Sequence, residues 1–107
     1  MVLGFAVLLL FLSVPVFAAT SIETLHEQAE AAEAKGDLST AIAKYRQILK
    51  LNPQLAPAYN NLGALYFKQG NFPKAAGVLK RALKVDPRMR SASVLLGMSL
   101  LQMSEYK

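Results

Sequence analysis

The sequence contains no cysteine and a single histidine, His26, in 107 residues. The absence of cysteine excludes disulfide bonds and thiolate metal sites. One histidine and seven carboxylates leave few ways to assemble a catalytic centre. The serines and threonines have no neighbouring base to activate them, and no glycine-rich loop is present to hold a phosphate. We therefore expect that the chain is not an enzyme and binds no cofactor.

Apolar residues are abundant (53%) but concentrated at the amino terminus. Val2 to Leu12 is an uninterrupted apolar run, and Ser13 and Pro15 then break it. This pattern predicts a signal peptide over residues 1–18, with cleavage before Ala19. An uncleaved membrane anchor and a wrongly assigned start codon are the alternatives. We expect the protein to be exported (periplasmic or extracellular), or membrane-anchored if the segment is retained.

Five helices are expected after this segment. Helix-start signals, capping residues and breakers predict helices over residues 22–35, 38–51, 57–70, 72–85 and 89–103. Thr20, Asp37 and Asn71 are the expected N-caps, Thr20 because its spacing to Glu23 fits a capping box. Gly36 and Gly70 should end the first and third helices in the left-handed conformation, which only glycine adopts without steric cost.

Residues 34 positions apart match along this region. The matched positions are Gly36 and Gly70, Ala41 and Ala75, Pro53 and Pro87, and Leu62-Gly63 and Leu96-Gly97. A single period of this kind indicates a helix-turn-helix unit that buries its apolar face by stacking on copies of itself. The predicted fold is all-α, a solenoid of about two and a half antiparallel helix pairs.

The second copy resembles the tetratricopeptide repeat (TPR) family. The matching residues are Tyr59-x2-Leu62-Gly63-x2-Tyr66, then Ala75-x3-Leu79, then Pro87. The resemblance covers residues 22 to 107 and implies one repeat at 22–55, a second at 56–89 and the first helix of a third at 90–107. Small residues at Gly63, Ala75 and Ala82 should let the two helices of a repeat approach closely.

The last predicted helix is apolar on nearly every side. A terminal helix of a repeat array normally has a polar outer face. We therefore expect that further repeats cover this helix, so that the sequence is a fragment of a longer array, or that a partner or a second copy covers it.

His26 and Glu30 are four residues apart and share a helix face, so a metal site with two ligands is conceivable. No third ligand is identifiable. The alternative, which we favour, is a solvated acidic helix face that includes one histidine, and we predict no metal site.

The net charge is +5, and basic residues dominate between Lys44 and Arg90. Several of them lie on the second helix of a repeat and should face the outer, convex side. They either keep the array soluble or attract an acidic partner or an anionic membrane surface. Nucleic acid is an unsuitable partner, because no aromatic residues alternate with the basic ones as stacking platforms.

The family resemblance implies a concave groove, lined by the first helix of each repeat, that binds an extended peptide or a partner helix. The residues expected to line it are His26, Glu27, Glu30, Asn60, Asn61, Phe67, Lys68, Leu95 and Met98. One subgroup of the family clamps a C-terminal carboxylate with basic residues in the first and third repeats. In this sequence the first repeat has His26 and Glu30 at the groove positions, and the third repeat has Leu95 and Met98. We therefore predict no such clamp.

The predicted function is a non-catalytic scaffold for protein–protein interaction. One alternative is an accessory segment of a longer exported protein, which could be an enzyme. Another is an adaptor to an anionic membrane surface. Possible further contacts are a membrane tether through residues 1–18 and self-association through the last helix.

Overall fold

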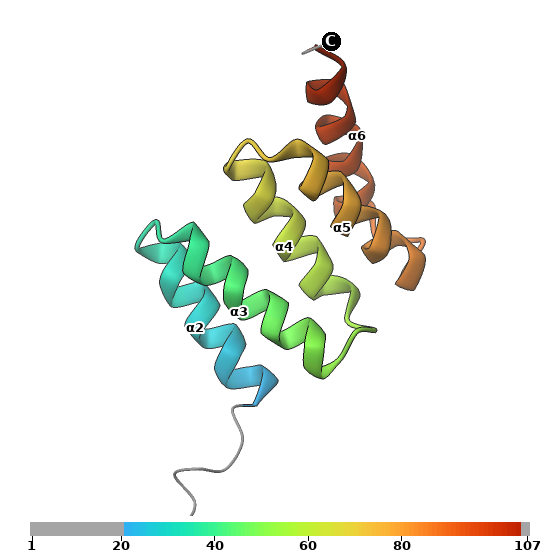
Figure 1. Ribbon diagram of the computed structural model, residues 1–107. Coiled ribbons are helices and arrows are strands. Elements are labelled where there is room, and N and C mark those ends of the chain that lie inside the picture. Colours follow the sequence, from blue (N-terminus) through green and yellow to red (C-terminus); the bar gives the residue numbers. More distant parts are fainter. Residues whose placement is uncertain (1–20, 106–107) are drawn as a thin grey trace, which may run out of the picture.

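The computed structural model describes residues 21–105, so the predicted signal peptide or anchor at residues 1–18 lies outside the described part. Five helices follow one another: α2 (Ile22–Ala34), α3 (Leu38–Leu51), α4 (Ala56–Lys68), α5 (Phe72–Val85) and α6 (Arg90–Glu105). Figure 1 shows them as antiparallel neighbours. The predicted all-α solenoid is thereby confirmed. None of these five helices is long and apolar enough to cross a membrane.

Side chains cap three of the helices. The side-chain oxygens of Ser21, Asp37 and Asn71 accept hydrogen bonds from the backbone N–H three residues later, at 3.1, 3.1 and 3.4 Å. Such a cap satisfies one of the N–H groups that the first turn of a helix leaves unpaired. The predictions for Asp37 and Asn71 are confirmed. The prediction for Thr20 was wrong by one residue, because Ser21 is the cap of α2.

Glycine ends α2 and α4, as expected. Gly36 has φ 77° and Gly70 has φ 76°, and no other described residue has a positive φ. In this conformation the chain reverses after each first helix, so that α3 returns along α2 and α5 returns along α4. The turn between the helices of a pair is therefore determined by one residue type at one position.

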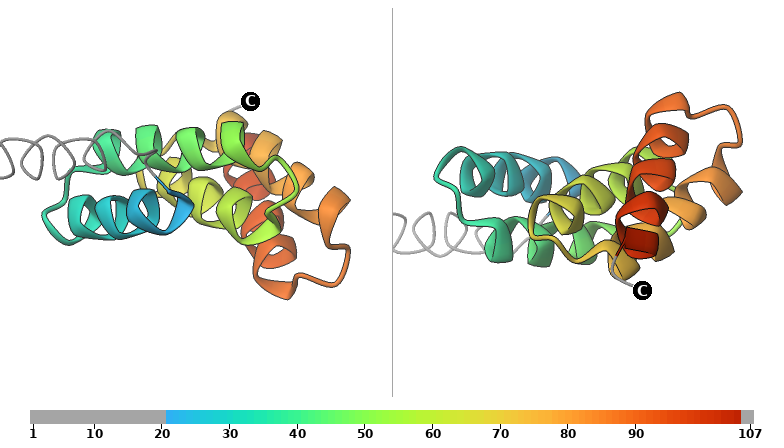
Figure 2. Two further views of the ribbon diagram at one scale, coloured as in Figure 1. Left: turned by 90° about the horizontal axis from the view of Figure 1, so that it is seen from below. Right: turned by 90° about the horizontal axis from the view of Figure 1, so that it is seen from above.

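The helices form two layers. Each packs against the helix that follows it in the chain, and α4 also packs against α6. Figure 2 shows α2 and α4 in one layer and α3 and α5 in the other. The backbones of α2 and α4 lie farther apart than those of consecutive helices, as do those of α3 and α5, and a groove runs between the helices of each of these two pairs.

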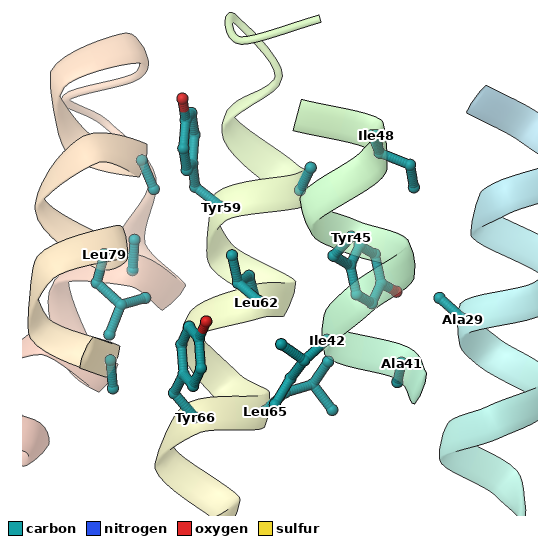
Figure 3. Packing of buried hydrophobic residues seen from close by; sticks show 14 of the residues in the cluster. Ala29, Ala41, Ile42, Tyr45, Ile48, Tyr59, Leu62, Leu65, Tyr66 and Leu79 are labelled. Carbon is teal, nitrogen blue, oxygen red and sulfur yellow. The ribbon is translucent and has the colours of Figure 1, made fainter. Parts of the chain in front are cut away.

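The core lies between the layers. Tyr45 of α3 points towards Ala29 of α2, and Leu65 and Leu62 of α4 lie between α3 and α5 (Figure 3). All four side chains are buried. Fully burying a leucine stabilises the fold by about 1.5–3 kcal/mol, so this shared core ties the repeats together.

Helices α4 and α5 approach each other closely at Gly63. A Cβ at this position would lie 2.5 Å from Cγ and from Cδ2 of Leu79, and Leu79 is fully buried. Ala75 and Ala82 are buried on the facing side of α5. The small residues thus allow the close approach that the sequence predicted.

Helix α6 buries only Ala92 and Ser99. Four of its large apolar residues remain exposed, namely Val94 (56% of its maximal area), Met98 (45%), Leu100 (43%) and Leu101 (59%). The structure therefore has an apolar surface at this end of the stack.

Candidate functional site

A groove between α2 and α4, here called the α2–α4 groove, brings together three of the predicted binding residues. It has a volume of about 450 Å³ and is lined by Ile22, Glu23, His26, Glu27, Ile48, Leu55, Pro57, Ala58 and Asn61. Its apolar side chains come from α2, α3 and the start of α4. Its polar side chains are Glu23, His26 and Glu27 of α2 and Asn61 of α4. Such a mixture of apolar surface with a few polar groups is typical of sites that bind a ligand.

His26 is held at the edge of this groove by two neighbours. Its Nδ1 lies 3.8 Å from Oε1 of Glu30. Its ring meets the ring of Tyr45 edge to face, with centroids 5.8 Å apart. Within residues 21–105, no group of three histidine, cysteine, aspartate or glutamate residues could hold a metal ion. The two side chains can form hydrogen bonds with a bound molecule, but two coordinating side chains make a poor metal site.

The far ends of α2 and α4 are joined by an ion pair. Nζ of Lys68 lies 3.4 Å from Oε2 of Glu33. Burial raises the pKa of Tyr45 nearby, and the carboxylates Glu33 and Glu30 raise it further. Exposed ion pairs contribute about 0–1 kcal/mol. The charge of Lys68, predicted to contact a ligand, is thus partly satisfied within the chain.

The remaining predicted residues lie outside the α2–α4 groove. Phe67 packs edge to face on Phe72, with centroids 5.2 Å apart. Asn60 is half-buried, and its Oδ1 is buried without a hydrogen-bond partner in the described part of the chain. On α6, Leu95 packs against the core while Met98 is exposed.

A second groove, between α3 and α5, was not foreseen and is here called the α3–α5 groove. It also has a volume of about 450 Å³, and its lining residues are Arg46, Leu49, Lys50, Pro53, Tyr59, Leu62, Tyr66, Lys74, Val78 and Arg81. An adjoining hollow of about 370 Å³ shares Pro53, Tyr59 and Arg81 and adds Gln54, Lys84 and Val85. Helices α3 and α5 form the walls of this groove, and α4 forms its floor.

The floor of the α3–α5 groove consists largely of two tyrosines. Figure 3 shows Tyr59 and Tyr66 on the same side of α4. They are seven residues apart in the sequence, which is about two helical turns. The hydroxyl of Tyr59 donates a hydrogen bond to the carbonyl oxygen of Pro53 at 3.0 Å. Nζ of Lys74 lies over the ring of Tyr66, 5.7 Å from its centroid, which is within the range of a cation–π interaction.

Sequence reasoning missed this groove because it assigned both tyrosines to packing. The available signal was the spacing of the cations. Arg46 and Lys50 are four residues apart on α3, and Lys74 and Arg81 are seven residues apart on α5. Each pattern puts its members on one helix face, but only the stacking of the two repeats brings the faces together.

Comparison with known proteins supports the repeat assignment. Two family models match the chain, described as "TPR repeat" over residues 34–70 and "Tetratricopeptide repeat" over residues 56–89. A heat-shock protein cognate co-chaperone, sgt12 of Aspergillus fumigatus, is 33% identical over 79% of this chain. The BBS4 homolog of the BBSome complex from Drosophila melanogaster is 27% identical over 69% of it. The aligned segment spans only 25% and 15% of these two relatives.

Solved structures agree with the fold. The Sgt2 TPR domain from Aspergillus fumigatus has a TM-score of 0.74 and 31% identity, and the match covers 82% of this chain and 58% of that domain. The TPR2B domain in a pHsp70 complex of yeast Sti1 has a TM-score of 0.73 and 25% identity, covering 79% and 68%. The resemblance inferred from the 34-residue period is thereby confirmed.

Proposed function

We propose that this chain, which contains tetratricopeptide repeats over residues 34–89, is a non-catalytic scaffold that binds a peptide or a partner helix in the α2–α4 groove. One observation carries the proposal. His26 and Glu27 of α2 and Asn61 of α4 line a single groove with apolar residues between them. The asparagine amide can donate to and accept from a peptide backbone, while the apolar residues bury its side chains.

The charge of this groove defines the ligand class. Glu23 and Glu27 line it, Glu30 lies beside His26, and no lysine or arginine is among its lining residues. A ligand that is both apolar and basic therefore complements it best. In the same proposal Asn60, Phe67, Lys68, Leu95 and Met98 belong to an extended binding surface along α4 and α6 rather than to the groove itself.

The related proteins support a role in protein interaction. One is described as a co-chaperone and another as a member of the BBSome complex, and a similar TPR domain is part of a complex with pHsp70. A second candidate is that this chain is an accessory segment within a longer protein. The exposed apolar residues of α6 favour it, because further repeats would cover them. In either case we propose export, or tethering through residues 1–18.

A titration followed by NMR tests the α2–α4 groove. The probe is a short amphipathic peptide of leucine and lysine, compared with its leucine–glutamate counterpart. We expect the lysine peptide to shift the backbone amide signals of residues 22–27 and 55–61. Combining Asn61→Ala with Glu27→Gln should weaken binding about tenfold, because a hydrogen bond and an ion pair are each lost.

The matched control combines Gln28→Ala on α2 with Glu105→Gln on α6. Both residues are exposed and line neither groove, so the control should bind like the unmodified chain. If the control loses as much affinity as the groove variant, or if both peptides bind equally well, the groove assignment is wrong.

A further inference from the structure

The α3–α5 groove is surrounded by positive charge from two repeats. Arg46 and Lys50 stand on the α3 side, and Lys74, Arg81 and Lys84 on the α5 side. All five side chains are exposed. No aspartate or glutamate is among the residues that line the groove or its adjoining hollow. A groove lined by charges of one sign concentrates the field and attracts the opposite sign.

None of these five cations is in an ion pair with another described residue. The ion pairs found within residues 21–105 are His26–Glu30 and Lys68–Glu33, both away from this groove. Four of the seven carboxylates of the chain lie on α2, on the other layer. The positive charge of the groove is thus left uncompensated by the fold itself, although like charges four residues apart destabilise a helix.

The floor of the groove can hold carboxylates in place. Tyr66 lines it, and no side-chain hydrogen bond found within residues 21–105 involves its hydroxyl. A tyrosine hydroxyl donates readily to a carboxylate. Arg46 and Arg81 can each bind a carboxylate through two parallel N–H groups, which the ammonium of a lysine cannot do.

We propose that the α3–α5 groove is a second binding site, which takes a short extended peptide segment rich in aspartate or glutamate. The cations on α5 run from Lys74 to Lys84, which is about 15 Å along a helix at 1.5 Å per residue. An extended chain of about four or five residues has this length. Its side chains alternate, so carboxylates can reach the α3 wall and the α5 wall in turn.

The shape of the site favours a peptide over a membrane. The cations stand on both walls of a groove whose floor is the buried side of Tyr59 and Tyr66. A linear chain can enter between α3 and α5 and contact both walls and the floor. A bilayer surface is flat on this scale and would contact only the rims. The α3–α5 groove and the α2–α4 groove have no lining residue in common. The proposal for the one therefore does not depend on the proposal for the other.

The test is a titration of the full chain with acetylated, amidated hexaglutamate, followed by backbone amide NMR signals, with hexaglutamine as the uncharged comparison. We expect saturable shifts in residues 46–53 and 74–84 with hexaglutamate alone. Combining Arg46→Gln, Lys50→Gln and Arg81→Gln should weaken binding at least tenfold. The control combines Lys80→Gln, Arg88→Gln and Arg90→Gln, three exposed cations that line neither groove.

The control removes the same charge, so it should weaken binding less than threefold if the site is the groove. Equal losses in the two variants would show general charge attraction and overturn the proposal, as would an absence of shifts. Co-sedimentation with phosphatidylcholine vesicles, with and without phosphatidylserine, adds the membrane alternative. Phosphatidylserine-dependent binding that the groove variant abolishes and the control retains, without hexaglutamate binding, would replace the peptide with a membrane surface.

Discussion

Replacing Gly63 with alanine tests the close approach of α4 and α5. The new Cβ would lie 2.5 Å from both Cγ and Cδ2 of Leu79. A change of χ2 moves Cδ2 but leaves Cγ in place, and Leu79 is fully buried. The helices must therefore separate. Overpacking of this kind costs about 1–3 kcal/mol, and here we expect the upper half of that range.

The glycine-to-alanine change also has a favourable part. Alanine stabilises a helix interior by about 1 kcal/mol relative to glycine. The net effect of Gly63→Ala should therefore be a loss of about 1–2 kcal/mol. Gly77 is the matched control, since it lies within α5 and a Cβ there would contact nothing within 4 Å. Gly77→Ala should stabilise the fold by about 0.5–1 kcal/mol.

Thermal unfolding followed by far-ultraviolet circular dichroism measures both variants. In a domain of this size 1 kcal/mol corresponds to about 4–8 °C in Tm, so the two variants should differ by roughly 6 °C or more. Adding Gly63→Ala to Leu79→Ala should not destabilise further, because the smaller side chain leaves room for the methyl group. If Gly63→Ala and Gly77→Ala raise Tm alike, the helices are farther apart than the structure has them.

Two further predictions concern stability. Tyr59→Phe removes the hydrogen bond to the carbonyl of Pro53 and should cost about 0.5–1.5 kcal/mol in urea unfolding; Tyr66→Phe loses no hydrogen bond to a described residue and should change less, and equal losses would contradict the reasoning. The hydroxyl and the backbone N–H of Thr40 lower the pKa of Asp37 from its ordinary 3.8. Because the folded pKa is the lower one, the stability that Asp37 contributes is present above about pH 4 and is lost as the pH falls through the folded pKa. Asp37→Asn should retain the cap but show a smaller fall in Tm on acidification, and an unchanged fall would refute this origin.

Much of the fold could be predicted from the sequence because its signals are local. Gly36 and Gly70 end helices at the positions expected, since the left-handed conformation depends on the residue itself. Asp37 and Asn71 cap the helices that follow, because a cap involves atoms only three residues apart. The 34-residue period then implied stacking, as a helix pair cannot bury its apolar face alone.

The candidate grooves could be predicted only in part. His26, Glu27 and Asn61 do line one groove, although the period gave their repeat positions and not their neighbours. Phe67 was expected to line the groove; its ring packs edge to face on Phe72, the first residue of α5, and its contact with a ligand stays a prediction. Lys68 was also expected to line the groove, and its Nζ pairs with Glu33. Both contacts join two different helices. The spacing of residues along one helix gives no information about such contacts.

The sequence by itself determined the helix bounds to within two residues and the repetition of the helix pairs, because those properties depend on residue type and short spacing. Only the tertiary structure decided which faces of neighbouring repeats meet. It joined Arg46 and Lys50 of one repeat to Lys74 and Arg81 of the next around two tyrosines. The physical reason is that a groove between non-adjacent helices is set by how the intervening helix packs, and the closeness of that packing depends on pairs such as Gly63 and Leu79.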